Sequence, residues 1–227
     1  MRIITWNCNQ ALGRKLASLI ALNPDIAVVQ ECGRNLVPPA GYTFAWHGIN
    51  PNKGLGILAK GPVIPLVHPV CERSAFFFPV YLPHLDLRLL AVWAFNHRVE
   101  KFDPPRTGMV LDVLDDLKDW LAPGRSIVAG DFNNNANWDK PGRPNRFVDI
   151  ATRLNALGFV SAYHEESGEA LGSETAMTHF WRKSVDTPYH IDYCFVHRAL
   201  KVSSVQIPDF ESWRKLSDHA PVVVEAN

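Results

Sequence analysis

The chain lacks an excess of charge of either sign, since its 23 Lys and Arg residues balance its 23 Asp and Glu residues. This balance argues against a strongly basic coat for binding nucleic acid, although a local basic patch is compatible with it. A small phosphoester, a nucleotide or a short single strand therefore remains open as the substrate.

Long apolar runs are also missing. No stretch approaches the length of a transmembrane helix, and the N-terminus enters a strand-like segment at once, without the features of a secretory signal. We therefore expect no membrane partner and a cytoplasmic location. Cysteine is scarce, and the four residues lack close metal-ligand spacing, so we expect buried, reduced thiols at Cys8, Cys32, Cys71 and Cys194.

Nothing in the sequence divides the chain. It has no internal repeat, low-complexity run or linker-like change of composition, and 47% hydrophobic residues are enough for one sizeable core. We expect residues 1–227 to form a single domain.

Strand and helix signals alternate along the chain. Apolar residues have helical spacing over residues 12–22, 109–121 and 147–157. Gly- and Pro-bearing turns separate further candidate strands, which are expected at residues 42–46, 55–59, 76–82 and 87–95. This mixture fits packed sheets with helices on the outside.

Several apolar runs have polar groups at their ends. Residues 3–7, 26–31 and 126–133 finish in amides or carboxylates, whereas Ser217-Asp218-His219 leads into Val222-Val223-Val224. Each case alone is also explained by a turn or a helix cap. Because strand ends gather distant residues on one edge, we expect a cluster of oxygens from Asn7, Glu31, Asp131, Asn133 and Asp218. Such a cluster suits Mg²⁺ or Mn²⁺ better than zinc.

The ordered set of motifs is more specific than any one of them. Trp-Asn-Cys-Asn at 6–9, Gln-Glu at 30–31, GDFN at 130–133, HIDYCFV at 190–196 and SDHAPV at 217–222 together resemble the endonuclease/exonuclease/phosphatase superfamily. The resemblance spans nearly the whole chain. It implies a four-layer α/β sandwich of the DNase I-like kind, with two central mixed β-sheets flanked by helices. It also implies a metal-dependent phosphoric ester hydrolase.

Roles for the metal ligands follow from their chemistry. A phosphodiester repels hydroxide, so a catalyst must neutralise charge and position a water for in-line attack. Glu31 is the first candidate ligand, Asn7 adds a neutral carbonyl that also faces substrate, and Asp218 adds a carboxylate. Asp131 is expected to activate the water and, as the resemblance implies, to contact metal. Asn133 would hold the water or the phosphate.

Two histidines resemble catalytic residues of the family. His219 matches the histidine that contacts the scissile phosphate, and Asp192 matches the carboxylate that orients its ring. The strand over residues 89–95 leads to His97, which resembles a histidine that protonates the leaving group or binds phosphate. The alternative for His97 is an exposed loop residue.

Three further residues are candidates for binding substrate. Exonuclease III-like relatives carry a tyrosine near residues 102–107, where this chain offers only Arg106, which either binds phosphate or is solvated. Lys53 precedes a glycine-led strand and either approaches substrate or lies in a turn. Trp181 either stacks on a base or packs in the core. The missing tyrosine argues against carrying over abasic-site specificity.

The leading hypothesis is therefore a nuclease that hydrolyses DNA or RNA with Mg²⁺, or Mn²⁺, as its cofactor. A phosphatase or phosphodiesterase for a small molecule or lipid headgroup is the alternative, although no amphipathic element favours a lipid. A non-catalytic phosphate-binding module is a third hypothesis, and the intact set of polar residues argues against it. The sequence leaves open the strand preference, endo or exo action, the number of metal ions and the oligomeric state.

Overall fold

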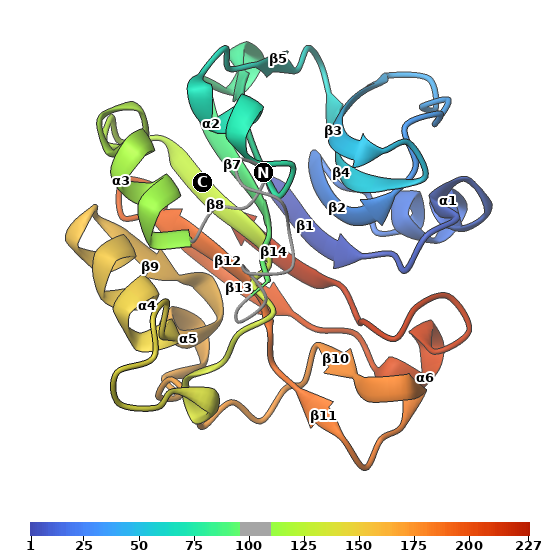
Figure 1. Ribbon diagram of the computed structural model, residues 1–227. Helices are drawn as coiled ribbons and strands as arrows, with labels where there is room; N and C mark the ends of the chain where they lie inside the picture. The colour runs from blue at the N-terminus through green and yellow to red at the C-terminus, as the bar shows by residue number, and fades with distance from the viewer. Residues whose placement is uncertain (96–109) are drawn as a thin grey trace.

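Two six-stranded β-sheets form the centre of the computed structural model, which describes residues 1–95 and 110–227 (Figure 1). The first sheet has the order β13 (Val202–Gln206), β14 (Val222–Ala226), β1 (Arg2–Asn7), β2 (Ile26–Cys32), β4 (Lys53–Lys60) and β3 (Tyr42–Asn50). The second sheet has the order β5 (Ile64–Pro65), β6 (Phe77–Leu82), β7 (Leu87–Trp93), β8 (Ser126–Asp131), β12 (Asp192–His197) and β9 (Phe159–Ser161). A small separate ribbon pairs β10 (His179–Phe180) with β11 (Pro188–Tyr189).

Helices cover the outer faces of both sheets. Side chains of α1 (Leu12–Ala21) and α6 (Phe210–Trp213) pack on the first sheet, and those of α2 (Pro69–Arg73), α3 (Val110–Leu121) and α4 (Phe147–Ala156) pack on the second. The remaining described helices are α5 (Ala162–Ser167) and the 3-10 turns Pro83–Leu85, Ala136–Trp138 and Trp181–Lys183. The predicted four-layer α/β sandwich is confirmed.

Alternating side chains explain why the strands are apolar on both faces. In β1, Ile3 points into the core between the sheets, whereas Ile4 points toward α1 and α6. In β8, Ile127 points into the same central core and Val128 toward α3 and α4. Successive residues of a strand face opposite sides, so a sheet buried on both faces needs continuous apolar runs.

The directions of the strands bring strand ends that are distant in sequence to one end of the sandwich. β1 is parallel to β2, and β7 is parallel to β8, so these four strands finish at the same end of the sandwich. β14 and β12 run antiparallel to β1 and β8, so each begins at that end. Asp192 is thereby paired directly with Asp131. We call this end of the two sheets the rim.

Most predicted elements are present, with some changes of boundary. The strand predicted to begin at Tyr42 extends to Asn50, and the HIDYCFV motif at 190–196 lies mainly on β12. The short helix α2 was not predicted, because its five residues are too few for a periodic pattern. The candidate residues His97 and Arg106 lie outside the described residues.

All four cysteines are free, and Cys8, Cys32 and Cys194 are buried while Cys71 is partly exposed. The prediction of buried thiols is therefore correct for three of them. Burial raises the pKa of Cys8 and of Cys194 to about 12, which keeps both protonated and unreactive at neutral pH. Within the described parts of the chain, we find no helix with the length and apolar character needed to span a membrane.

Candidate active site

An amide at the end of β1 joins two carboxylates on the rim. The side-chain nitrogen Nδ2 of Asn7 donates to Oδ2 of Asp131 at 3.0 Å and to Oε1 of Glu31 at 3.4 Å. Asn7 and Asp131 are buried, and the Glu31 side chain is 17% exposed. Residues from β1, β2 and β8 thus meet within hydrogen-bond distance, as predicted from the strand ends.

Glu31 reaches this cluster through an irregularity of its strand. The pairing of β2 with β4 shifts register between Gln30 and Cys32, and Glu31 between them has a left-handed φ of 60°. A bulge re-aims the side chain of the extra residue, and a non-glycine residue tolerates positive φ only at a cost. The carboxylate Oε2 of Glu31 also forms an ion pair with Nζ of Lys53 at 3.1 Å.

Asp131 is held rigidly at the end of β8. Gly130 before it has a φ of 154°, and a Cβ atom there would lie 1.8 Å from the carbonyl oxygen of Val92, so only glycine allows β7 and β8 to approach. The backbone amide of Asn133 donates to Oδ1 of Asp131 at 2.8 Å, and its side-chain Nδ2 donates to Oδ2 at 3.1 Å. Burial, followed by the charge of Asp192, raises the pKa of Asp131.

A buried histidine and a buried carboxylate form an ion pair on the same rim. Nδ1 of His219 lies 2.8 Å from Oδ2 of Asp192. Burial alone would lower the pKa of His219, but the charges of Asp192, Asp131 and Asp218 outweigh it and raise the pKa to about 9. His219 is therefore an imidazolium at neutral pH. The second oxygen of Asp192, Oδ1, is buried without a hydrogen-bond partner among the described residues.

Asp218 lies between two polar side chains that sequence reasoning did not select. Its Oδ1 accepts a hydrogen bond from Nδ2 of Asn9 at 2.9 Å, and its Oδ2 lies 3.9 Å from Nε2 of His179. The rings of His179 and His219 are 4.4 Å apart. Burial, followed by the charge on His219, lowers the pKa of His179, so this second histidine is neutral.

Several other contacts on the rim were also missed. Oγ of Ser217 donates to the carbonyl of Asn7 at 2.7 Å and accepts from the amide of His219. Oγ1 of Thr178 accepts from the amides of Ile191 and Asp192. Ser217 belongs to the recognised SDH motif, which was a usable signal. Thr178 and His179 belong to the segment that holds the candidate Trp181, but neither was selected, because only tertiary pairing of β10 brings them to the rim.

The donor set fits a hard divalent cation. Ligand atoms of Asp131, Asp192 and His219 lie within 4.8 Å of one another. Because His219 occupies Oδ2 of Asp192 with its own hydrogen bond, the carboxylates of Glu31 and Asp131 are better suited to hold an ion that prefers oxygen. Asn7 directs its amide nitrogen at both carboxylates and would offer its oxygen only after half a turn of the amide.

The remaining candidates differ in where they lie. Lys53 opens β4 beside Glu31, rather than standing in a solvated turn. Trp181 is 55% exposed at the end of β10, which excludes the alternative of core packing. It lies near the rim, since its neighbour Phe180 donates a backbone hydrogen bond to the carbonyl of Asp218.

The fold and the site together define a class of protein. Two mixed sheets lie between helical layers in a DNase I-like arrangement, and one rim gathers carboxylates, amides and an ion-paired histidine. The model of the Endonuclease/Exonuclease/phosphatase family matches residues 4–219, and the chain belongs to that family. We find no curated protein sequence that matches the chain.

Solved structures agree with this fold. A 3′ phosphatase from Neisseria bound to a product DNA hairpin superposes with a TM-score of 0.77 at 20% identity, covering 100% of this chain and 99% of that one. An AP endonuclease from Archaeoglobus fulgidus gives 0.72 at 17% identity, covering 99% and 98%. The catalytic domain of Xenopus laevis APE2 gives 0.70 at 14% identity, covering 100% and 91%. At these identities the likeness concerns the fold.

Proposed function

We propose that the protein is a divalent-metal-dependent phosphodiesterase that cleaves DNA or RNA. The observation that carries the proposal is the convergence of the Asn7, Glu31 and Asp131 cluster with the Asp192–His219 ion pair on one rim. Buried, charged groups of this density are costly to a fold unless they bind or react with something. Membership of a family of phosphoester hydrolases supports the same reaction class.

Asp131 and Asn133 act on the attacking water. The raised pKa of Asp131 makes its carboxylate a stronger base than an exposed aspartate, which suits removal of a proton from water near neutral pH. Asn133 fixes Asp131 through two hydrogen bonds and thereby sets the direction in which that proton is accepted. Correct positioning of the water for in-line attack is a large part of the catalytic effect.

His219 acts on the phosphate. Asp192 keeps its ring protonated and oriented, so His219 donates to a phosphate oxygen and stabilises the charge that develops there. Glu31, Asp218, Asp131 and Asn7 are the proposed metal-binding residues. A bound Mg²⁺ or Mn²⁺ would supply further neutralisation of the phosphate charge.

Two observations favour nucleic acid as the substrate. Trp181 is an exposed aromatic side chain near the rim, with the guanidinium of Arg182 5.9 Å from its ring centre, and such aromatics provide stacking surfaces for bases. Proteins of the same fold include a phosphatase bound to a DNA hairpin and an AP endonuclease. A small phosphoester is the second candidate, favoured by the zero net charge.

A cleavage panel tests the proposal. Purified protein is incubated with single- and double-stranded DNA, RNA, a duplex containing an abasic site, a 3′-phosphorylated strand and a generic phosphodiester, each with Mg²⁺, Mn²⁺ or EDTA. Asp131→Asn serves as the inactive control. We expect metal-dependent cleavage of a nucleic acid that Asp131→Asn loses. Hydrolysis of only the generic ester would support the small-phosphoester candidate, and no hydrolysis at all would favour a phosphate-binding module.

We also propose that residues 1–227 form one domain and act in the cytoplasm. A single apolar core containing residues of both sheets supports the first statement. Four free thiols support the second, because such thiols persist in a reducing compartment.

A further inference from the structure

A small apolar pocket lies between the two sheets, beside the rim cluster. Its volume is about 200 Å³, and its lining includes Ile49, Asn50, Lys53, Ala75, Phe76 and Trp93. The residues come from the hairpin of β3 and β4 on one side and from the segment before β6 and the end of β7 on the other. None of these side chains has a role in the reaction proposed above.

Two residues connect the pocket to the rim. Nζ of Lys53 lies 3.1 Å from Oε2 of Glu31 and 5.2 Å from the centre of the Trp93 ring. Trp93 pairs with Asp131 across β7 and β8, so both side chains point to the same face of the sheet. The side chains of Lys53 and Trp93 therefore lie between the pocket and the carboxylate cluster. His219 and Asp192 lie across the cluster, on β12 and the segment before β14.

Trp93 carries a donor that the described part of the chain leaves unused. Its indole Nε1 is buried without a hydrogen-bond partner there, and the residue is only 6% exposed. Buried indole N–H groups are usually paired, because leaving one unpaired costs free energy. The pocket thus has aromatic and aliphatic walls, and Trp93 contributes its ring to them while its Nε1 stays buried.

We propose that this pocket binds one nucleobase adjacent to the scissile phosphate. The inference rests on the proposed function and specifies the part of the substrate that the pocket takes. A volume of about 200 Å³ admits a single planar group rather than a whole nucleotide. Aromatic and apolar side chains stack on any base, because every base has a π-face. Lys53, at the edge of the pocket, is ion-paired with Glu31 of the proposed metal-binding cluster.

Binding without catalysis tests the inference directly. The indole N–H resonance of Trp93 is identified in a nuclear magnetic resonance spectrum by its absence from Trp93→Phe. The protein is then titrated in EDTA with deoxyadenosine 5′-monophosphate and, as the matched control, with deoxyribose 5-phosphate. We expect the nucleotide to shift this resonance and the sugar phosphate to leave it in place. Equal shifts with both ligands, or none with the nucleotide, would overturn the proposal.

Variants of residues that line the pocket test whether the nucleotide binds there. Ala75→Leu fills the pocket and should abolish the nucleotide-induced shift, whereas Val37→Ala, at an 86% exposed position outside the pocket lining, should not. If Ala75→Leu does not fold, Ile49→Ala replaces it, because the Ile49 side chain is 55% exposed and its loss is tolerated more easily. We expect Ile49→Ala to weaken nucleotide binding about fivefold.

Cleavage separates this inference from the proposed function. A single abasic tetrahydrofuran residue is moved through the positions that flank the cleaved phosphate of an oligonucleotide. At one position it should raise KM by roughly 5- to 100-fold for the wild type, have little effect for Ala75→Leu, and have an effect about fivefold smaller than the wild-type one for Ile49→Ala. Metal-dependent cleavage that is indifferent to every such residue would refute the pocket and leave the nuclease proposal standing. A shift of the Trp93 resonance without any cleavage would support the pocket and refute the nuclease proposal.

Discussion

Among the described residues, two pairs of a histidine with a carboxylate lie within hydrogen-bond distance, and they differ in how many of their polar atoms have partners. On the rim, His219 lies 2.8 Å from Asp192, whose other oxygen has no partner among the described residues. Beside α5, His164 Nε2 lies 3.1 Å from Oε1 of Glu174, whose oxygens also accept from the amide of Gly172 and from Asn135.

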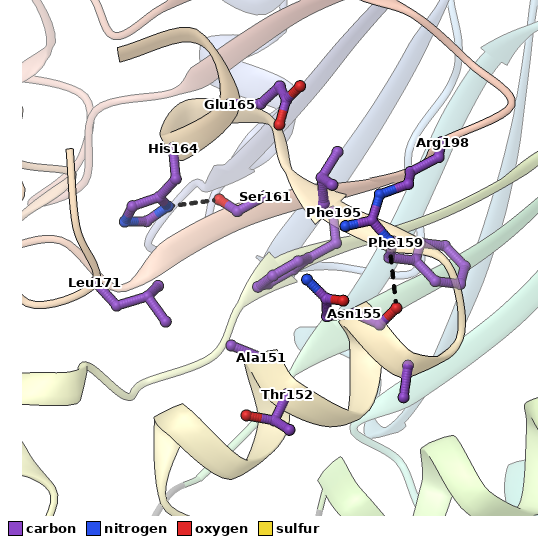
Figure 2. A pocket seen from close by; sticks show the side chains of 12 residues that line it. Ala151, Thr152, Asn155, Phe159, Ser161, His164, Glu165, Leu171, Phe195 and Arg198 are labelled. Carbon is purple, nitrogen blue, oxygen red and sulfur yellow. Dashed lines mark hydrogen bonds between the residues drawn. The ribbon is translucent and has the colours of Figure 1, made fainter. Parts of the chain in front are cut away.

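In the second pair, the polar atoms of both side chains have hydrogen-bond partners. Nδ1 of His164 lies 2.8 Å from Oγ of Ser161, so both ring nitrogens have partners. Figure 2 shows this contact with Ser161 in the cavity that both residues line. That cavity has a volume of about 540 Å³, larger than the pocket beside Trp93, yet His164, which lines it, has partners for both of its ring nitrogens. A cavity becomes a reactive site through unfilled hydrogen-bonding capacity, not through size.

From this difference we predict that the Asp192–His219 pair acts in catalysis, whereas the His164–Glu174 pair stabilises the fold. Burial opposes ionisation of Glu174, but the hydrogen bonds from His164, Gly172 and Asn135 together outweigh it and lower its pKa to about 2. At the rim, carboxylates crowd together and the pKa of Asp131 is raised instead. Arrangements that raise a carboxyl pKa cost stability, and they are tolerated where function requires them.

The largest expected effect concerns activity at the rim. Asp192→Asn removes the charge that keeps His219 protonated and oriented, so we expect the cleavage rate to fall by on the order of 10²- to 10⁴-fold. Stability should change little, because a partly unpaired buried charge is also removed. Rates with the substrate identified in the cleavage panel, together with urea unfolding, measure both quantities. Asp119→Asn, at an exposed position of α3, is the matched control.

The next effect concerns stability at the second pair. Glu174→Gln replaces a carboxylate that accepts from several donors by an amide, so we expect a loss of about 3 kcal/mol in the free energy of unfolding at pH 7. Cleavage below the unfolding transition should change by less than about threefold. Glu165→Gln, at an exposed position of α5, should cost under about 0.5 kcal/mol. Equal losses in the two variants would remove the distinction.

Lowering the pH tests the role of the Glu174 carboxylate in stability. The folded-state pKa of Glu174, about 2, lies below its ordinary value of 4.5, so its stabilisation is full above about pH 5 and is lost as the pH falls toward 2. The stability difference between wild type and Glu174→Gln should therefore shrink over this range. Urea unfolding of both proteins at pH 7, 5, 4 and 3 measures it. A constant difference would mean that the carboxylate is not ionised in the folded protein.

The smallest effect concerns the exposed edge of the site. Trp181→Ala removes a stacking surface that is already half solvated, so we expect KM for single-stranded nucleic acid to rise about fivefold with kcat nearly unchanged. Hydrolysis of a small phosphodiester should not respond. Steady-state kinetics with both substrates measures the split. Val185→Ala, equally exposed nearby, serves as the control.

The fold was predictable because the strands are buried on both faces and polar residues mark their ends. Asn7, Glu31 and Asp131 follow from that pattern, since parallel strands finish at one edge. His179 did not follow from it. Its two-residue strand is too short for a periodic signal, and only the pairing of β10 near His219 brings it to the rim.

Other misses have the same origin. Glu174 lies outside every described helix and strand, and one of its partners, Asn135, is 39 residues before it in the chain. The pocket beside Trp93 depends on the spacing of two sheets, which no local pattern encodes. Lys53 was a candidate because it precedes a glycine-led apolar segment, but its ion pair with Glu31 depends on the β2 bulge.

Cleavage by His219→Ala and His164→Ala, measured side by side with Mg²⁺ below both unfolding transitions, tests the central claim most directly. Each variant removes the histidine from one buried pair. We predict that His219→Ala loses at least about 100-fold in rate, whereas His164→Ala unfolds more easily than the wild type and cleaves at close to the wild-type rate. Unchanged cleavage by His219→Ala, or equal losses in both variants, would contradict the assignment of chemistry to the rim.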